Sequence, residues 1–427
     1  MEQKPSFIST WRVLIIGVIA VILVAGAALV IKAVGQPVPQ EKTSSVNVLT
    51  NSTDPCVVCH AKETAGIFEQ YGGSKMAAAK VSCQDCHVVE KGYPGSNEHE
   101  GYSVLASPTT ARCQNCHQEE VAQFYQSRHS LPAYVAVWGS KELDANATAM
   151  YKAIPEGSFA PDKSRNSIAA IEKPELTRFT CETCHNIGKP AADGSAGQCQ
   201  KCHLRHTFSL EQARKPETCN ACHIGPDHPQ WEIYQESPHG IAYATSGTNW
   251  HWEAAPGTLK VTDFPAPTCA ICHMSGFGSS TTTHDVGDRL SWFLFSQVSV
   301  RRPDWQGNLG RMQAVCFQCH NAEFINTFYS AADIATERVN ELVKEADVIM
   351  QPLKDNKLLS DAPFDEPLDF VYFDLWHYYG RTSKFGLWMQ GPDYAQWHGA
   401  YELLSRMSEL RSLAQDKLQK AGITPGP

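Results

Sequence analysis

The 427-residue sequence predicts a mainly α-helical, loop-rich fold whose interior is not built from aliphatic side chains alone. Its sixteen cysteines form eight Cys-x-x-Cys pairs, each followed directly by histidine, at spacings too irregular for a solenoid repeat. Strand signals are few. Short amphipathic helical patterns occur at 63–71, 119–128 and 210–214, and longer ones at 331–353 and 394–418. We therefore expect a loop-rich body followed by a C-terminal helical bundle.

The repeated motif has the composition of a c-type heme attachment site. Two thiols at this spacing reach the heme vinyl groups, and the adjacent imidazole binds the iron. A zinc ribbon needs no following histidine, and a thioredoxin-like redox pair needs one motif rather than eight. The sequence therefore predicts a multiheme cytochrome c fold wrapped around eight covalently bound c-type hemes. The predicted attachment residues are Cys56, Cys59, His60, Cys83, Cys86, His87, Cys113, Cys116, His117, Cys181, Cys184, His185, Cys199, Cys202, His203, Cys219, Cys222, His223, Cys269, Cys272, His273, Cys316, Cys319 and His320.

These motifs use every cysteine, so no disulfide remains to stabilise the fold, and hemes must supply much of the core. The formal net charge is −9, and the lysines and arginines are dispersed along the chain. This balance argues against nucleic acid as a partner and favours redox partners met by electrostatic steering.

An apolar run at 13–31 lies between Lys4 and Arg12 on one side and Lys32 on the other. It exceeds the roughly 7–15 residues of a cleavable signal core and approaches the about 20 residues that span a bilayer. We expect a single-pass signal anchor that places the remaining chain on the periplasmic side of the bacterial inner membrane. A cleaved export signal is the alternative, because small residues lie near the end of the run. The expected divisions are a transmembrane helix at 1–35, a flexible tether at 36–53, an octaheme-binding domain at 54–325, and a C-terminal helical region at 326–427 that supplies distal ligands and subunit contacts.

Nine histidines lie outside the motifs, against the eight that complete bis-histidine ligation would need. In a chain rich in heme, each of them is a candidate iron ligand. They are His99, His129, His206, His228, His239, His251, His284, His377 and His398.

Several segments contain residues that heme attachment does not require. Residues 199–234 read CQKCHLRHTFSLEQARKPETCNACHIGPDHPQWEIY, and 272–278 read CHMSGFG. Residues 282–292 read TTHDVGDRLSW, while VYFDLWH and GPDYAQWHG occupy 371–377 and 391–399. From about 54 to about 404, the chain resembles the hydroxylamine oxidoreductase family of octaheme cytochromes.

The resemblance implies that the fourth heme is catalytic and lacks a distal protein ligand, whereas the other seven are bis-histidine centres. By motif order, Cys181, Cys184 and His185 hold the catalytic heme. The family's adjacent Asp-His pair matches Asp227-His228, which implies a proton relay; the alternative for Asp227 is a cap or turn residue. With His228 and the unmatched His251 set aside, the implied distal ligands are His99, His129, His206, His239, His284, His377 and His398.

Met76, in the segment QYGGSKMAAAKVSC, stands where the family often has histidine. Its thioether either packs against a heme face or ligates iron and raises the potential of that heme. Ligation by Met76 would release His377 or His398 for another role.

The implied activity is the interconversion of small nitrogen compounds, namely hydroxylamine, nitric oxide, nitrite and ammonium, at the fourth heme. The other hemes would carry electrons to a redox partner cytochrome or a quinone-linked membrane protein. Oxidising members of the family are homotrimers in which a neighbouring subunit's tyrosine is linked to the catalytic heme, and relatives without this link run reductively. Tyr379, Tyr378 and Tyr394 are candidates for the link, with simple helix packing as the alternative. The direction of catalysis stays open.

Two other functions are compatible with the motifs. One is a non-catalytic, membrane-anchored electron-transfer cytochrome, which would have no open iron position. The other is reduction of a sulfur oxyanion such as tetrathionate, which the match of Asp227-His228 to the nitrogen family disfavours.

Overall fold

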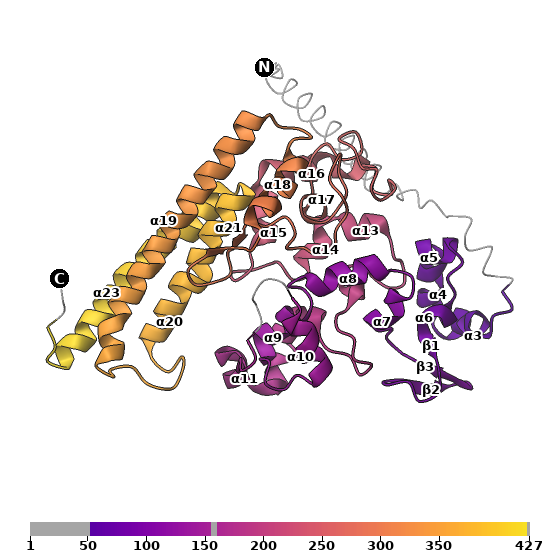
Figure 1. Cartoon of the computed structure of the whole chain (residues 1–427), viewed down its shortest axis with the longest axis horizontal. Helices are drawn as coiled ribbons and strands as arrows, with labels where there is room; N and C mark the ends of the chain where they lie inside the picture. Colours follow the sequence, from indigo (N-terminus) through magenta and orange to yellow (C-terminus); the bar gives the residue numbers. More distant parts are fainter. Residues whose placement is uncertain (1–51, 155–159, 425–427) are drawn as a thin grey trace, which may run out of the picture. The chain divides into compact units, whose positions relative to one another are not determined.

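The computed structural model describes residues 52–154 and 160–424 (Figure 1). The predicted anchor and nearly all of the predicted tether lie outside these residues. Within the described ranges, no helix is both long enough and apolar enough to cross a bilayer.

The body of the protein consists of short helices joined by loops, as the sparse strand signals predict. Three of its helices are formed by the repeated motif itself: α6 (Cys83–His87), α12 (Cys181–His185) and α17 (Cys269–His273). One helical turn places the two cysteines of each motif on the same face. The other helices before residue 160 are α3 (Pro55–Glu63), α4 (Ala65–Gly72), α5 (Lys75–Ala78), α7 (Thr110–Gln114), α8 (Gln118–Gln126), α9 (Leu131–Trp138) and α10 (Ala145–Lys152).

The second half of the body continues in the same way, with aromatic side chains forming a local core. Trp250, Trp252 and Phe264 pack with Ile271 of α17, so apolar contacts stabilise this motif directly. The remaining elements here are α11 (Ser167–Thr177), η1 (Asn186–Gly188), η2 (Cys199–Lys201), α13 (Leu210–Arg214), α14 (Pro216–Asn220), α15 (Gln230–Glu236), α16 (Pro238–Ser246), η3 (Gly247–Asn249) and α18 (Trp305–Cys316).

Strands are short and peripheral to the helices. β1 (Val88–Val89), β2 (Asn97–His99) and β3 (Tyr102–Val104) form an antiparallel sheet in the order β1-β3-β2. This sheet places His99 at the end of β2, opposite Tyr102. β4 (Trp292–Phe293) pairs with β5 (Val300–Arg301).

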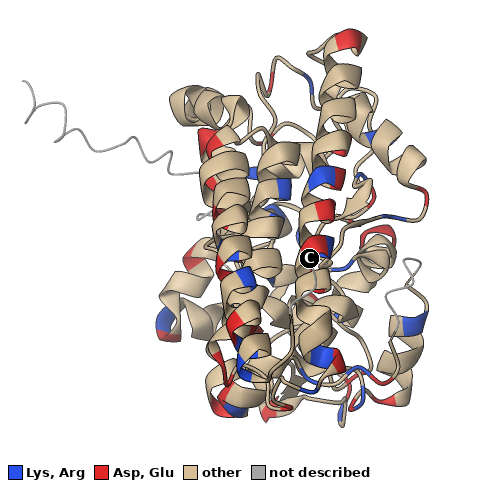
Figure 2. Cartoon of the chain, turned by 90° about the vertical axis from the view of Figure 1, so that its left-hand side faces the viewer, with Lys and Arg blue, Asp and Glu red and all other residues tan. Residues whose placement is uncertain are grey.

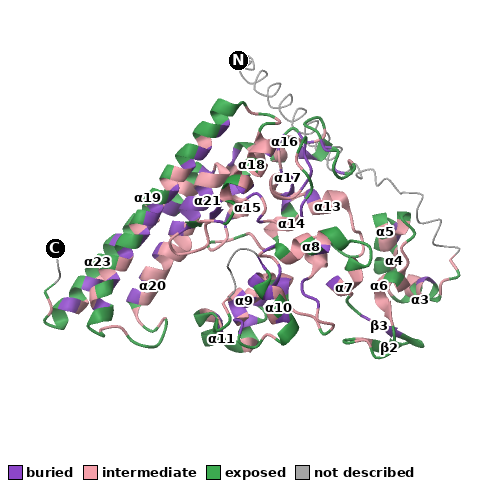
Figure 3. Ribbon diagram, in the orientation of Figure 1, coloured by how far each residue is buried: buried purple, intermediate pink, exposed green. Residues whose placement is uncertain are grey.

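The C-terminal region is a helical bundle, as predicted. α19 (Ala322–Asp355) begins before the predicted boundary at 326, because Asn321 caps it by accepting a hydrogen bond from the Phe324 amide at 2.9 Å. Its buried residues recur every three or four positions and face those of α23 (Tyr401–Lys420), which gives the stripe of buried positions in Figure 3. The stripe includes Val339, Val343, Ala346, Met350 and Leu353 of α19 and Leu403, Met407, Leu410, Ala414 and Leu418 of α23.

Between these two long helices, the chain folds into a second layer that contains two π-helical segments. α20 (Pro367–Phe373) runs through η4 (Asp374–Gly380) into α21 (Arg381–Met389), and α22 (Pro392–Ala395) leads through η5 (Gln396–Ala400) into α23. The predicted helix at 394–418 therefore covers three elements. π-helical turns are rare and often occur at functional sites.

The surface of the bundle carries charges of both signs. Figure 2 shows acidic and basic residues interspersed on these helices. Arg411 of α23 pairs with Glu345 of α19, and Lys417 pairs with Glu366. This distribution is typical of a solvated helical face rather than of a nucleic-acid-binding surface.

Candidate heme sites and the fourth motif

Five motif histidines each have a second histidine ring opposite them. The partner comes from a distant part of the chain in most of these pairs, so the fold and not the motif brings the rings together. The ring-centre separations are 6.0 Å for His60–His99, 6.2 Å for His87–His206, 6.2 Å for His203–His284, 5.9 Å for His223–His129 and 6.2 Å for His320–His239.

These separations fit an iron atom between the rings. An imidazole nitrogen binds a metal at roughly 2 Å, so two imidazoles on opposite sides of one iron have ring centres about 6 Å apart. Rings packed face to face in direct contact would lie closer. The structure thus places five of the seven predicted distal histidines where bis-histidine ligation requires them.

Several motif histidines are oriented through their second ring nitrogen. The Nδ1 atoms of His87 and His185 each lie 2.7 Å from a backbone carbonyl oxygen, of Leu105 and Ala133 respectively. His60 Nδ1 lies 2.8 Å from Thr64 Oγ1. An Nδ1–H that donates to such an oxygen leaves Nε2 free for iron, as ligating histidines require.

Burial lowers the pKa of some of the paired imidazoles, such as those of His129 and His203. Desolvation, assisted by the neighbouring His223, lowers the pKa of His129 to about 3. Desolvation lowers the pKa of His203 to about 4 in the same way, with His284 as the second cause. Only a neutral imidazole has a lone pair for iron, so the fold prepares these rings as ligands.

The proximity of thiols gives the spatial order of the motifs. The first motif lies next to the second, the second to the third, the third to the fifth, and the fifth, sixth, seventh and eighth follow in turn. The fourth motif branches from the sixth. Thiols in hydrogen-bonding contact are Cys113 and Cys199, Cys219 and Cys269, and Cys184 and Cys222. Thiols near enough to interact electrostatically are Cys56 and Cys83, Cys86 and Cys116, Cys202 and Cys219, and Cys272 and Cys316.

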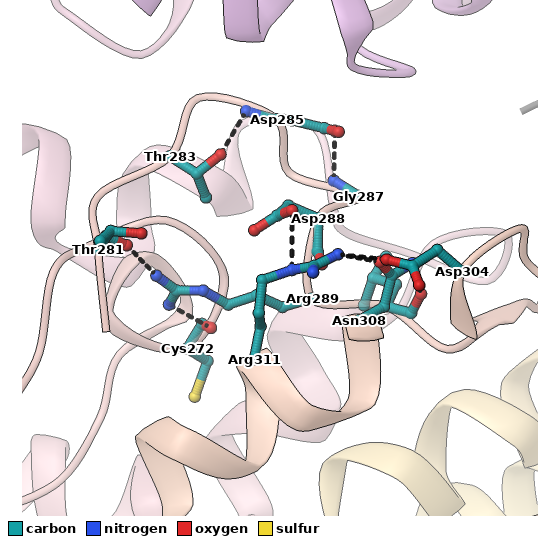
Figure 4. A network of polar contacts seen from close by, with 11 residues as sticks. Cys272, Thr281, Thr283, Asp285, Gly287, Asp288, Arg289, Asp304, Asn308 and Arg311 are labelled. Carbon is teal, nitrogen blue, oxygen red and sulfur yellow. Dashed lines mark hydrogen bonds and ion pairs between the residues drawn. The ribbon is translucent and has the colours of Figure 1, made fainter. Parts of the chain in front are cut away.

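A buried polar network holds the seventh motif and the loop that carries His284 (Figure 4). Arg289 is 3% exposed and donates to the carbonyl oxygens of Ile271 and Cys272 at the end of α17. It also donates to the carbonyl oxygens of Ser275 and Thr281. These bonds satisfy helix-terminal acceptors and fix the approach to His284, which explains why this arginine follows the histidine in sequence.

The fourth motif differs from the paired ones in what stands behind the facing histidine. His228 lies 6.3 Å from His185, with the ring planes at 75°, and also 6.1 Å from His223. His228 Nδ1 is 2.7 Å from Asp227 Oδ2. The two residues follow a turn at Gly225, whose φ of +81° is favourable only for glycine. Asp227 therefore lies in a turn and also contacts the imidazole of His228.

Asp227 is also held from the C-terminal bundle. His377 Nδ1 lies 2.9 Å from Asp227 Oδ1, and Arg381 Nη1 donates to the same oxygen at 3.0 Å. Burial disfavours the carboxylate, but the nearby imidazoles of His228 and His377 outweigh it and hold the pKa of Asp227 well below its usual range. We call Asp227, His228, His377 and Arg381 the Asp227 cluster.

Aromatic rings surround the Asp227 cluster. Phe295 lies 5.3 Å from His228, and Phe373 stacks on His377 at 4.1 Å. The Arg381 guanidinium lies over the rings of Phe295 and Trp376. These contacts fix the side chains and reduce the access of water, which strengthens the electrostatic interactions inside the cluster.

The other predicted histidines lie elsewhere. The position of His377 in the cluster departs from the prediction that it faces a motif histidine. His398 Nε2 lies 3.1 Å from Asp393, and its ring stacks on Tyr394. His251 is exposed and pairs with Asp263 at 3.0 Å. In residues 52–154 and 160–424, His117 and His273 have no facing histidine ring.

The three candidate tyrosines occupy different surroundings. Tyr378 has Asp227 among its charged neighbours, and together with burial this raises the pKa of its phenol. Tyr379 packs against the core of the bundle, and Tyr394 contacts His398. Sequence reasoning missed Arg381 and Phe295. The spacing of His377 and Arg381, four residues apart on a helix, was the available signal for the arginine.

Comparison with known proteins identifies the family of this chain. A family model described as a seven-times multi-haem cytochrome CxxCH matches residues 79–367. The chain belongs to this family. Its prosthetic groups are covalently bound c-type hemes. The matched range contains the second to eighth motifs, and the first motif precedes it.

Individual relatives are similar over most of this multiheme cytochrome. A Kuenenia stuttgartiensis protein described as a probable nitrite reductase-hydroxylamine oxidoreductase fusion is 24% identical over 384 residues, covering 77% of the chain but 41% of that protein's length. A solved structure described as a hypothetical multiheme protein has a TM-score of 0.74 at 20% identity, covering 90% of this chain and 99% of that one.

A second solved structure, of a Kuenenia stuttgartiensis reducing HAO-like protein complex, has a TM-score of 0.64 at 19% identity. It covers 88% of this chain and 87% of that one. At these identities, the solved structures establish the fold.

Proposed function

We propose that this cytochrome carries eight hemes and interconverts small nitrogen compounds at the fourth, while the other hemes transfer electrons. The single observation that carries this proposal is the Asp227 cluster beside His185. A carboxylate in contact with His228, His377 and Arg381 suits proton transfer to a bound substrate, which simple electron transfer does not require. The nitrite reductase-hydroxylamine oxidoreductase relative supports this choice of substrate.

Heme bound at Cys181, Cys184 and His185 would supply an open coordination position for a nitrogen atom and a route for electrons. Asp227 accepts the Nδ1–H of His228 and so directs His228 Nε2 away from the carboxylate. Nε2 then holds or releases the proton that the substrate gains or loses. Arg381 and His377 keep Asp227 ionised and in place, and Phe295 limits the access of water.

The branching of the fourth motif from the sixth suits multi-electron chemistry. Converting hydroxylamine to nitrite removes four electrons, more than one heme can store. The heme of the sixth motif lies next to that of the fourth. It would pass electrons towards either end of the series, through the heme of the fifth motif or that of the seventh. We propose this series as the path to a redox partner cytochrome or quinone-linked protein.

We further propose the periplasmic face of the inner membrane as the location, on the basis of the apolar run at 13–31. A homotrimer with a tyrosine-to-heme link belongs to the oxidising version of this proposal. A non-catalytic electron carrier remains the second candidate function, and it is favoured by the facing histidine at 6.3 Å from His185, a separation similar to that of the paired sites.

The test is a double variant, Asp227→Asn with His228→Ala. Loss of general acid–base catalysis lowers turnover of hydroxylamine or nitrite by about 10²–10⁴-fold. The mass of the protein should show every heme still attached, because neither residue belongs to a motif. Unchanged turnover would remove the Asp227 cluster from the mechanism.

A further inference from the structure

Three segments of the chain share one turn. Each begins with a tyrosine in a helix that ends just before a buried serine: YGGSKM at 71–76, YQSRH at 125–129 and YQESPH at 234–239. The three serines, Ser74, Ser127 and Ser237, are 3%, 0% and 1% exposed. The residue two positions after the serine is Met76, His129 or His239.

The backbone of the three turns is closely similar. The serines have φ/ψ of −84°/159°, −74°/150° and −68°/154°. Each serine amide donates to the carbonyl oxygen three residues earlier, at 2.9, 3.0 and 3.1 Å. Ser74 and Ser237 also cap the next helix in the same way, each accepting from the third helical amide at 3.1 Å. Met76 and His239 thus occupy the same position, the second residue of a capped helix.

Two of the three turns present an iron ligand. His129 faces His223 at 5.9 Å, and His239 faces His320 at 6.2 Å. In all three turns a buried serine follows the end of a helix, and its fixed backbone sets where the residue two positions later lies. Met76 is half-buried at this position, and its thioether can bind heme iron, whereas Lys75 of the same helix pairs with Glu253 at 2.8 Å.

A motif histidine without a facing ring is linked to α5 through α6. Within the described residues, His117 of the third motif has no histidine opposite it, although Glu120 lies 3.8 Å from its Nδ1 and leaves Nε2 free. Residues 79–82 join α5 to α6 and span at most about 14 Å. α6 in turn contacts the third motif, since Arg112 donates to the Asp85 carbonyl oxygen at 2.7 Å.

The seventh motif is the less suitable partner for Met76. His273 also lacks a facing ring within the described ranges, but the thiols of its motif contact those of the sixth and eighth motifs rather than the second or third. The first and second motif histidines already face His99 and His206.

We propose that Met76 is the distal ligand of the third heme, opposite His117. A thioether is a weaker donor to ferric iron than an imidazole, so exchange of histidine for methionine raises the reduction potential. The third heme is then the most oxidising of the low-spin hemes. Because it stands between the second and fifth motifs, it would draw electrons away from the fourth heme and hinder their return.

The experiment compares the full-length holoprotein with Met76→Leu and Met76→His. The wild-type ferric protein should show the sulfur-to-iron charge-transfer band of one His–Met heme in its near-infrared magnetic circular dichroism spectrum. Both variants should lose this band, and Met76→His should gain one bis-histidine heme with a potential lower than that of the lost centre. Met274→Leu, at the methionine after His273, is the matched control and should keep the band.

Absence of the band from the wild type, or its survival in Met76→Leu, would overturn the proposal. Assignment to the third heme is checked with Cys113→Ser and Cys116→Ser together, where the loss of one heme mass must accompany loss of the band. If this variant does not fold, His117→Ala replaces it and should likewise abolish the band, while methyl-labelled methionine tests ligation itself. The Met76 methyl resonance should be strongly shifted by an adjacent heme, and an unshifted resonance would contradict ligation.

Discussion

The distance between the motif histidine and the histidine that faces it is similar in the histidine-paired motifs and in the fourth motif, but the surroundings of the facing histidine differ. His129 faces His223 at 5.9 Å, and His228 faces His185 at 6.3 Å. His129 lies among other imidazoles, and its burial together with them depresses its pKa. His228 instead contacts the ionised carboxylate of Asp227, which His377 and Arg381 of the bundle also contact.

The difference teaches that distance alone does not separate a ligand from a proton-transfer group. A ligating imidazole must be neutral and must keep a free lone pair towards the iron. A carboxylate behind the imidazole orients the ring in both cases, so the contact between Asp227 and His228 does not by itself decide between the two roles. We propose the second role for His228 because Arg381 and His377 contact the same carboxylate, and this contrast generates the predictions that follow.

The largest expected effect separates the two kinds of histidine by spin state. His129→Ala should convert a low-spin bis-histidine heme into one with an open position, because it removes an iron ligand. His228→Ala should leave the number of low-spin hemes unchanged. Electron paramagnetic resonance of the two variants makes the comparison directly. Gain of a high-spin heme in His228→Ala would show that His228 is a ligand, and the contrast would fail.

A smaller effect is expected from the bundle side of the cluster. Arg381→Gln removes one charge-assisted hydrogen bond to Asp227, worth about 1.5–3 kcal/mol, while His228 and His377 remain. We expect kcat to fall by about tenfold with full heme content. The matched control is Arg338→Gln, which removes an exposed guanidinium that pairs with Glu341 on the surface of α19. An equal loss in both variants would point to general destabilisation.

The smallest effect is expected at His251, which belongs neither to the paired histidines nor to the Asp227 cluster. His251→Ala removes an exposed ring that pairs with Asp263 in the described part of the chain, so its effect on unfolding free energy should stay within about 0.5 kcal/mol. Visible spectra and turnover should match those of the wild type. A change in spin state would mean that His251 ligates iron in the assembled protein.

Much of the fold was predictable because its determinants are local. Motif spacing identifies the attachment residues, and the apolar periodicity at 331–353 identifies the central part of α19. The pair Asp227-His228 was found because its two residues are adjacent in sequence. His377 was predicted to be a distal ligand, whereas the structure places it beside Asp227. The local sequence does not indicate that η4 packs against the turn after Gly225. Long-range packing also determines which histidine faces which motif.

The central claim is that one heme, the fourth, keeps an iron position open to substrate. The most direct test is the electron paramagnetic resonance spectrum of the oxidised holoprotein, before and after addition of hydroxylamine or nitrite. We predict a high-spin ferric signal that substrate alters while the low-spin signals persist. A spectrum with low-spin hemes alone, unchanged by either compound, would contradict the claim and leave the chain as an electron carrier.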